Sequence, residues 1–330
     1  MIISKTPLRL SFFSGGSDLP SFYEHEDGAA FSVTIDKFIY VCVHKTPHCG
    51  IKFMYEDVQH VYDIDDMQHH ITKETLKVFD NLGNNLTIAS ISDILCKGSG
   101  LGSSSAFTVG LWNALYTLDG GELNNPTRSA IYAATIEMDK CNYPVGLQDQ
   151  YAAAYGGLNL FRFSKGGKVK VDKPKIAKKI LNKLEDNLLL VYSGKERQAN
   201  VILQKQKEAM LNKEKFALVA KNRNKAFESI KILRAGNTDD FGNLLHEAWI
   251  DKKQIVSGIS DTYFDTIYNT ATKAGAIGGK LLGAGGGGFF LFYVPKDKRS
   301  NVINKLTSDT LCKIYDFKFY DKGSHIITKD

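Results

Sequence analysis

Apolar and polar positions alternate at the start of the chain. Between residues 2 and 14, Leu8, Leu10 and Phe12 are separated by polar side chains. This period of two is typical of a strand with one face in the core. Further extended runs rich in β-branched and aromatic residues predict strands at 30–44, 51–62, 188–192 and 313–319.

Other stretches have the spacing of helices. The apolar positions that follow Ser103 predict a helix that continues to about Leu118. Pro126 favours the start of a second helix, from about Thr127 to Lys140, because proline is well tolerated in a first helical turn. Further helices are expected at 213–235, 238–254, 261–273 and 300–308.

The length and composition are those of an ordinary globular protein. With 330 residues, 43% of them hydrophobic and 24% charged, the chain is long enough for one large domain or two modest ones. Within 165–188 a Gly-Gly turn, a Lys-Pro-Lys and an amphipathic helix precede a strand. This stretch is the strongest candidate boundary, and it predicts an N-terminal domain at 1–185 and a C-terminal domain at 186–330.

Charge and cysteine content exclude several classes of protein. The net charge of +6 is spread along the chain, and the densest basic stretch, 165–183, resembles a solvated face more than a nucleic-acid site. The five cysteines lack CxxC spacing and are odd in number, which argues against a zinc site or a disulfide framework. No window reaches the ~18 apolar residues of a membrane span and no signal peptide precedes the first strand. We therefore expect a cytoplasmic protein without membrane or nucleic-acid partners, and the oligomeric state stays open, a homodimer included.

A loop rich in glycine and serine precedes the first long helix, from Lys97 to Phe107. Glycines let a backbone turn its N–H groups toward an anion, and a helix N-terminus adds further unpaired N–H groups and a positive dipole end. A serine in the first turn can cap the helix or reach a Mg²⁺ ion. A serine-capped turn alone would give the same pattern. The candidate phosphate-binding residues are Lys97, Gly98, Ser99, Gly100, Leu101, Gly102, Ser103, Ser104 and Ser105.

The loop is not a Walker A motif, because no Gly-Lys-Ser/Thr follows the first glycine at the required spacing. It resembles the second motif of the GHMP kinases, although Leu95-Cys96-Lys97 stands where that family usually has prolines. Residues 7–18 resemble the first motif and 278–292 the third. The GxGxxG within the third run is followed by a strand, so a Rossmann site is not expected.

The resemblance implies a two-domain α+β fold, with an N-terminal domain of the ribosomal protein S5 domain 2 type and a ferredoxin-like C-terminal domain. It implies phosphoryl transfer from ATP with Mg²⁺ on Ser104 and Glu137. Asp149 falls on the catalytic aspartate, with Arg9 stabilising the transferred charge. From the sequence alone Asp149 could equally be a helix N-cap, and both roles could hold together. Candidate substrate contacts are Gly15, Gly16, Ser17, Asp18, Lys195, Arg197, Gly285 and Gly286.

Within the family, the segments 14–18, 148–151 and 193–197 look most like the bacterial D-glycero-D-manno-heptose 7-phosphate kinases, and fucokinase domains come next. The implied reaction phosphorylates the anomeric hydroxyl on the path to GDP-heptose for surface polysaccharide. A sugar phosphate needs cations at its far end, which Lys195, Arg197 and Lys280 could supply. A kinase for a neutral sugar such as fucose or galactose, an ATP-dependent decarboxylase and a non-catalytic sugar sensor are the alternatives.

Overall fold

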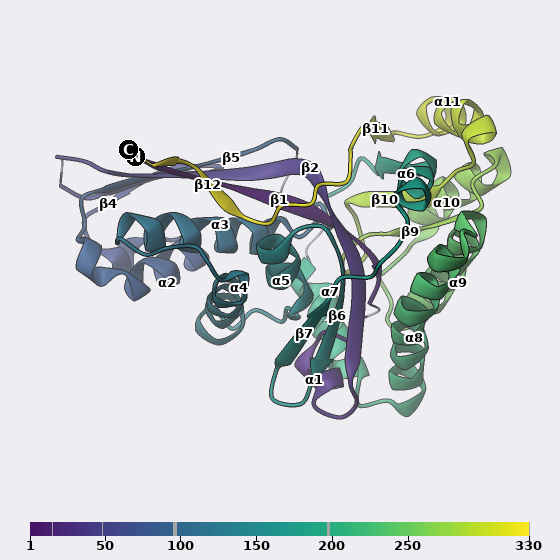
Figure 1. The fold of residues 1–330 in the computed structure, drawn as a ribbon, viewed down its shortest axis with the longest axis horizontal. Coiled ribbons are helices and arrows are strands. Elements are labelled where there is room, and N and C mark those ends of the chain that lie inside the picture. Colours follow the sequence, from purple (N-terminus) through teal and green to yellow (C-terminus); the bar gives the residue numbers. More distant parts are fainter. Residues whose placement is uncertain (15, 48, 95–97, 197–198, 330) are drawn as a thin grey trace.

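The computed structural model describes residues 1–14, 16–47, 49–94, 98–196 and 199–329, and its strands form two sheets (Figure 1). The first sheet has eight strands, in the order β12-β1-β2-β5-β3-β4, with β6 pairing with β2 and β7 with β6. The second is antiparallel, in the order β11-β8-β10-β9. The strands of the first sheet are β1 (Ile2–Phe13), β2 (Gly28–Lys45), β3 (Ile51–Met54), β4 (Val58–Val61), β5 (Leu86–Ser92), β6 (Leu158–Ser164), β7 (Lys168–Asp172) and β12 (His325–Lys329). Those of the second are β8 (Leu188–Tyr192), β9 (Gly278–Leu281), β10 (Phe289–Tyr293) and β11 (Lys313–Tyr315).

The long strand β2 organises the first sheet. It pairs with β1 along most of its length, while its first part, from Gly28, pairs with β6 and its second part, from Ile39, with β5. In Figure 1 the helices α2 to α5 lie beneath this sheet. They are α2 (His70–Val78), α3 (Ser103–Leu118), α4 (Pro126–Ala134) and α5 (Gln148–Tyr155), and a short α1 (Pro20–Tyr23) follows β1. Short 3-10 turns lie at Ile64–Asp66, Asp80–Leu82 and Lys296–Lys298.

The helix α3 is the centre of this layer because it is buried on nearly all sides, from Ser105 to Leu115. Gly110 lets it approach the sheet closely, since a Cβ there would lie 2.8 Å from the hydroxyl of Thr6. The N-terminus of α3 is therefore held at a fixed place beneath β1. That placement positions the glycine-rich loop.

Side chains of the second sheet alternate between two cores. Leu189, Val191 and Phe290 face a cluster that includes Trp249 and Phe264, whereas their neighbours on β8 and β10 join the core of the first sheet. This alternation follows from the period of two along a strand, and it fuses the two halves of the molecule. The helices of this half are α6 (Lys178–Asn187), α7 (Ala199–Ala209), α8 (Lys213–Ala235), α9 (Thr238–Lys253), α10 (Thr262–Ala274) and α11 (Arg299–Asp309).

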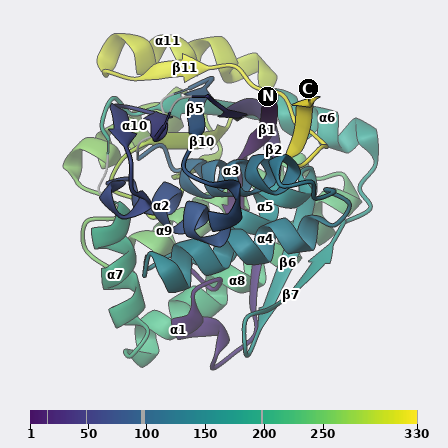
Figure 2. The same cartoon turned by 90° about the vertical axis from the view of Figure 1, so that its left-hand side faces the viewer.

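Most predicted elements are confirmed, but two predicted strands have other bounds and several elements were not predicted. The run 51–62 is two strands, and the strand expected at 313–319 ends at Tyr315. The helix α2 and the strands β5, β6, β7 and β12 were not predicted. Strand β12 pairs with β1 and brings the C-terminal end beside the N-terminus (Figures 1 and 2). The division at residues 185 and 186 stays a prediction, and β12 belongs to the first sheet although it follows that division.

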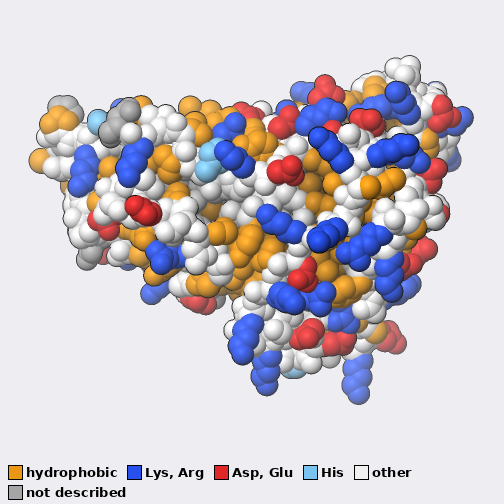
Figure 3. Space-filling view, in the orientation of Figure 1, with side chains coloured by type: hydrophobic (Ala, Val, Ile, Leu, Met, Phe, Trp, Pro, Cys, Tyr) orange, Lys and Arg blue, Asp and Glu red, His pale blue; other side chains and the backbone are white. Residues whose placement is uncertain are grey.

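The lysines of the basic stretch lie on the surface. Every lysine between Lys165 and Lys183 is exposed, and in Figure 3 the positive side chains on the right-hand half of the face are interspersed with acidic and apolar ones. Among the described residues no helix is long and apolar enough to cross a membrane. The four described cysteines are free thiols.

Candidate active site

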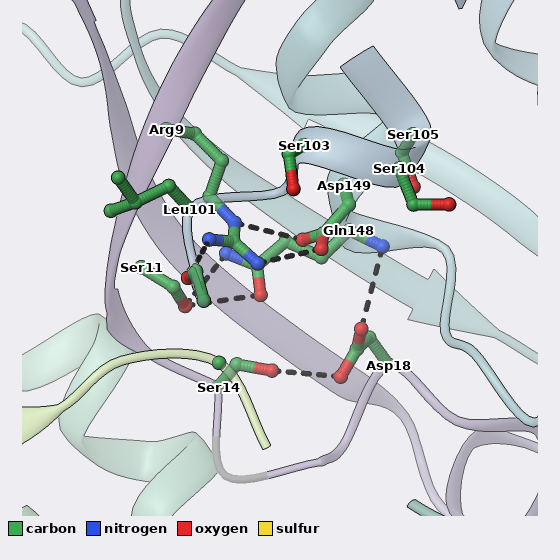
Figure 4. Close-up of polar contacts among 12 residues, drawn as sticks. Arg9, Ser11, Ser14, Asp18, Leu101, Ser103, Ser104, Ser105, Gln148 and Asp149 are labelled. Atoms are coloured by element: carbon green, nitrogen blue, oxygen red, sulfur yellow. Dashed lines mark hydrogen bonds and ion pairs between the residues drawn. The ribbon is translucent and has the colours of Figure 1, made fainter. Parts of the chain in front are cut away.

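An ion pair between β1 and α5 lies at the centre of the site. Arg9 Nε donates to Asp149 Oδ1 at 2.8 Å and Nη2 donates to Oδ2 at 2.6 Å, so the contact is bidentate (Figure 4). The side chain of Arg9 is 5% exposed and that of Asp149 is 29% exposed. This geometry fixes the orientation of the carboxylate while leaving it open to a ligand.

The N-cap interpretation of Asp149 is wrong. Leu147 occupies the N-cap position of α5, and Asp149 lies in the first turn with its carboxylate on Arg9. The helix begins without a side-chain cap. The carboxylate is therefore directed out of the helix toward β1, where a reacting group can reach it.

The glycine-rich loop packs against the same arginine. The guanidinium Nη1 of Arg9 donates to Gly100 O at 2.6 Å, and the backbone N–H of Arg9 donates to Leu101 O at 2.9 Å. Gly98, Gly100 and Gly102 all have positive φ, which favours glycine, and α3 begins at Ser103 as predicted. The loop thus ends at the N-terminus of a buried helix, the arrangement expected of an anion site. Lys97 lies outside the described residues.

Glu137 is fully buried beside this loop and has several hydrogen-bond donors around it. Ser104, Ser105 and Thr108 donate to its carboxylate at 2.8, 2.7 and 3.1 Å, and the Gln150 amide donates as well. Burial raises the pKa of Glu137, while these hydrogen bonds lower it. Glu137 lies on a π-helical turn at Thr135–Lys140, where the helix predicted at 127–140 widens. Such turns are frequent at functional sites.

The oxygen atoms of Glu137 and Ser104 are ligands of the kind that Mg²⁺ prefers. Mg²⁺ is usually bound through one or two carboxylates together with substrate phosphates, and the exposed Ser104 hydroxyl lies directly on Glu137. No group of three His, Cys, Asp or Glu side chains among the described residues could hold a metal ion by itself. A cation here would therefore take its other ligands from a nucleotide and water.

A second carboxylate, Asp18, stands near the first. Ser14 Oγ donates to Asp18 Oδ1 at 2.9 Å, and the Gln148 N–H donates to Oδ2 at 3.4 Å (Figure 4). Desolvation raises the pKa of Asp18, and the negative charge of Asp149 raises it further. Gly146 makes this approach possible, since a Cβ there would lie 2.2 Å from Asp18 Oδ2.

These groups line a cavity that we call the central pocket. One wall, from the first half of the chain, includes Arg9, Ser14, Asp18 and Asp149. The opposite wall, from the second half, includes Gln206, Lys252, Lys280 and Ala284. Gly16 also lines the pocket, and its contact with a substrate stays a prediction.

Other candidate residues lie elsewhere. Ser17 is buried and its hydroxyl donates to Ala29 O at 2.8 Å, so it holds the loop after β1. The ammonium group of Lys195 lies 3.9 Å from the ring centre of Tyr263 and does not line the central pocket. Gly285 and Gly286 pack on Ile259 and Ile202. Gly15 and Arg197 lie outside the described residues.

Sequence reasoning missed two residues of the second wall. Lys252 Nζ, on α9, donates to Leu281 O at 3.1 Å and to Gly283 O at 2.5 Å. It thus braces the glycine-rich turn, residues 282–288 between β9 and β10. Gln206, on α7, donates to Ala284 O at 3.1 Å. Both belong to ordinary amphipathic helices, and no local sequence signal marks them.

Two family models match the chain where these groups lie. One, described as the GHMP kinases N terminal domain, matches residues 70–157, and the other, GHMP kinases C terminal, matches residues 229–310. The chain belongs to the GHMP kinase family. As a GHMP kinase it has the two-domain α+β fold expected above, and family membership implies ATP as the phosphoryl donor.

Similarity to individual GHMP kinases indicates the type of GHMP kinase to which this chain belongs. The chain is 30% identical to D-glycero-alpha-D-manno-heptose 7-phosphate kinase of Campylobacter jejuni, over 98% of this chain and 97% of that one. The structure is similar to that of a D-glycero-D-manno-heptose 1-phosphate kinase from Bacteriodes thetaiotaomicron, with a TM-score of 0.80, 26% identity and full coverage of both chains. The protein is a sugar kinase of the heptose phosphate type, a phosphotransferase with an alcohol group as acceptor.

A more distant structure shows the fold alone. Galactokinase of Lactococcus lactis, solved with galactose, has a TM-score of 0.75 at 17% identity, covering 98% of this chain and 94% of that one. The two proteins thus share the same fold although few of their residues are identical.

Proposed function

We propose that this GHMP kinase transfers the γ-phosphoryl group of ATP to the anomeric hydroxyl of D-glycero-D-manno-heptose 7-phosphate. The observation that carries the proposal is the bidentate Arg9–Asp149 pair, which joins the glycine-rich loop to the central pocket. A carboxylate held in place and open to a ligand suits the deprotonation or orientation of an attacking hydroxyl. Phosphoryl transfer relies mainly on such positioning and on charge neutralisation.

The roles of the residues follow from their positions. Backbone N–H groups from Gly98 to Ser105 would hold the nucleotide phosphates at the start of α3. Ser104 and Glu137 would hold Mg²⁺, which supplies positive charge to the phosphates. Asp149 would accept the proton of the sugar hydroxyl or orient it, and Arg9 would stabilise the charge on the transferred group.

Asp18 would contact the sugar from the same wall. Its carboxylate already accepts hydrogen bonds from Ser14 and the backbone of Gln148, so its position in the pocket is fixed. Carboxylate oxygens are acceptors for sugar hydroxyls. The pair Asp18 and Asp149 would therefore orient the sugar ring toward the loop.

Both heptose kinases support a phosphorylated sugar as substrate, but their names differ in the position of the phosphate. One name has the phosphate at position 7 and the other at position 1. The identity of the phosphorylated hydroxyl is therefore a point that the experiment must establish. The proposal follows the first name, with a 1,7-bisphosphate as the product.

The test is ADP release with MgATP and heptose 7-phosphate, beside unphosphorylated heptose, fucose, mannose and galactose. We expect turnover with the 7-phosphate and an anomeric phosphate signal in the phosphorus NMR spectrum of the product. If a neutral sugar is turned over in preference to the 7-phosphate, the substrate assignment is wrong, whereas the assignment as a sugar kinase still holds. Release of CO₂, or binding without ADP release, would instead indicate a decarboxylase or a sensor.

A further inference from the structure

Lys280 places a positive charge inside the central pocket. The residue lies on β9, an edge strand of the second sheet, and is 5% exposed. Its ammonium group donates to Phe12 O on β1 at 2.8 Å, across the junction between the two sheets. A side chain from one half of the molecule thus ends on the backbone of the other, at the wall of the pocket.

The charge of Lys280 has no anionic partner among the described residues. The carboxylate of Asp149 is paired with Arg9, and that of Asp18 accepts from Ser14 and Gln148. No ion pair among the described residues includes Lys280, whose hydrogen bond is to a carbonyl oxygen. A buried cation is costly unless it is paired, so the pocket is suited to a ligand that brings negative charge.

The position of Lys280 indicates which part of the ligand carries that charge. The central pocket is lined by Asp149 but by none of the residues from Gly98 to Ser105, so it is the chamber of the acceptor. Phe12 lies three residues beyond Arg9 on β1, roughly 10 Å along an extended strand. Lys280 therefore reaches the acceptor from the wall opposite Asp149, the residue assigned to the reacting hydroxyl.

We propose that Lys280 binds the phosphate group that the sugar substrate already carries. The proposal rests on the proposed function, and among the three cations that the sequence suggested it selects Lys280, because Lys195 lies over Tyr263. A phosphate monoester carries about −1.5 to −2 charges at neutral pH, which matches an unpaired ammonium group. Lys252 supports the assignment by holding the carbonyl groups of Leu281 and Gly283, next to Lys280.

The electrostatics of the pocket support a proton-linked binding step. Burial and the positive charge of Arg9 lower the pKa of Lys280 to about 7. The other charged groups lining the pocket are Asp18, Asp149 on α5 and Lys252 on α9. Because a bound dianion favours the charged lysine, the enzyme will take up a proton when the sugar phosphate binds near pH 7.5.

The kinetic test compares Lys280→Met and Lys280→Arg with the wild-type enzyme, using heptose 7-phosphate and unphosphorylated heptose as acceptors. Loss of a charged hydrogen bond should lower kcat/KM of Lys280→Met for the 7-phosphate about 10- to 100-fold, mainly through KM. The KM for ATP should change little, and the loss of activity on heptose should be smaller than the loss on the 7-phosphate. Lys280→Arg, which keeps the charge, should retain part of the preference. Lys273→Met, an exposed lysine on α10, is the matched control.

The outcomes separate the two proposals. A wild-type enzyme without a preference for the phosphorylated heptose overturns the proposed substrate, and the Lys280 assignment with it. If the wild-type enzyme prefers heptose 7-phosphate and Lys280→Met keeps that preference, only the Lys280 assignment is wrong. The same holds if Lys195→Met abolishes the preference. An equal loss of kcat on both acceptors, with KM unchanged, would also overturn it, since Lys280 would then act on the transferred group.

Binding without turnover provides a second readout. Titration calorimetry of heptose 7-phosphate in buffers of different ionisation enthalpy should show proton uptake near pH 7.5 in the wild-type enzyme. Lys280→Arg should bind the ligand without that uptake, because arginine stays charged. Unchanged proton uptake in Lys280→Arg would contradict the assignment. Thermal unfolding of each variant shows whether it is folded.

Discussion

The two walls of the central pocket hold their polar groups in different ways. In the first wall the carboxylates have side-chain partners, Asp149 with Arg9 and Asp18 with Ser14. In the second wall Lys252 and Lys280 donate to backbone carbonyls, including those of the glycine-rich turn. The first wall can therefore orient a reacting hydroxyl, whereas the second combines positive charge with a shape that depends on backbone geometry. Substitutions in each wall should affect different kinetic constants.

The largest effect is expected for Asp149→Asn in the first wall. The variant keeps the size of the side chain but removes the group that accepts or orients the proton. We expect kcat to fall about 10²-fold or more, with a smaller change in the KM of the sugar. Steady-state kinetics under saturating ATP would measure it. Turnover close to that of the wild type would remove Asp149 from the catalytic role.

The next largest effect is expected where the glycine-rich turn (282–288) contacts the glycine-rich loop (98–105). Gly288 has φ of 88°, and a Cβ there would lie 2.3 Å from Ser99 O. We expect Gly288→Ala to lower the free energy of unfolding by about 1–3 kcal/mol and to weaken ATP binding, because the loop must move.

Gly120→Ala is the matched control for that substitution. Gly120 has φ of 91°, but a Cβ at this position would meet no atom within 4 Å, so the substitution shares the backbone strain without the clash. Urea unfolding and the KM for ATP should therefore separate the two variants. Equal effects at both positions would show that strain alone accounts for the loss.

A smaller effect is expected for Lys252→Met in the second wall. The substitution removes hydrogen bonds to Leu281 O and Gly283 O, so the turn loses its brace. We expect the KM for the sugar to rise about tenfold, with kcat changed less, since charged hydrogen bonds contribute about 1.5–3 kcal/mol. Lys252→Arg should recover part of the loss. A fall in kcat alone would place Lys252 with the first wall.

The smallest effect is a pH dependence of stability from Asp18. In the folded protein the pKa of Asp18 is raised above its ordinary value of 3.8. At pH values between the ordinary pKa and the raised pKa, the folded state therefore binds more protons than the unfolded state. The free energy of unfolding should therefore fall as pH rises through this window. Asp18→Asn should remove that contribution.

Glu137 has a raised pKa as well, so the measurement is a difference between two proteins. Urea unfolding of the wild type and of Asp18→Asn should be compared at several pH values from about 3.5 upward, just below the ordinary pKa of an aspartate. The stability of the variant relative to the wild type should increase with pH across the window. A difference that does not vary with pH would contradict the raised pKa.

The sequence predicted the elements of the first wall well. The loop from Gly98 to Gly102, the start of α3 and the end of α5 at Gly156 all depend on glycine conformation and on helix termini, which are local properties. The bidentate contact of Arg9 with Asp149 spans 140 residues, and its two members were proposed together through the family resemblance.

The second wall was predicted less well. Lys195 was expected in the pocket because it follows a strand beside a helix, but its side chain lies on Tyr263. Lys252 was missed because it lies between two other charged residues, Asp251 and Lys253, at the end of α9 and no local pattern distinguishes it from them. Which face of a helix meets a pocket is set by packing between elements, and the sequence pattern of one helix does not report it.

By itself the sequence determined most of the long helices, several of the strands, the glycine positions that need positive φ, and the carboxylates available for chemistry. These follow from backbone sterics and from side-chain periodicity within short segments. Tertiary structure alone decided that β12 joins β1 and that Lys280 ends on Phe12. Contacts across hundreds of residues depend on how two cores pack together, and that packing is a property of the whole chain.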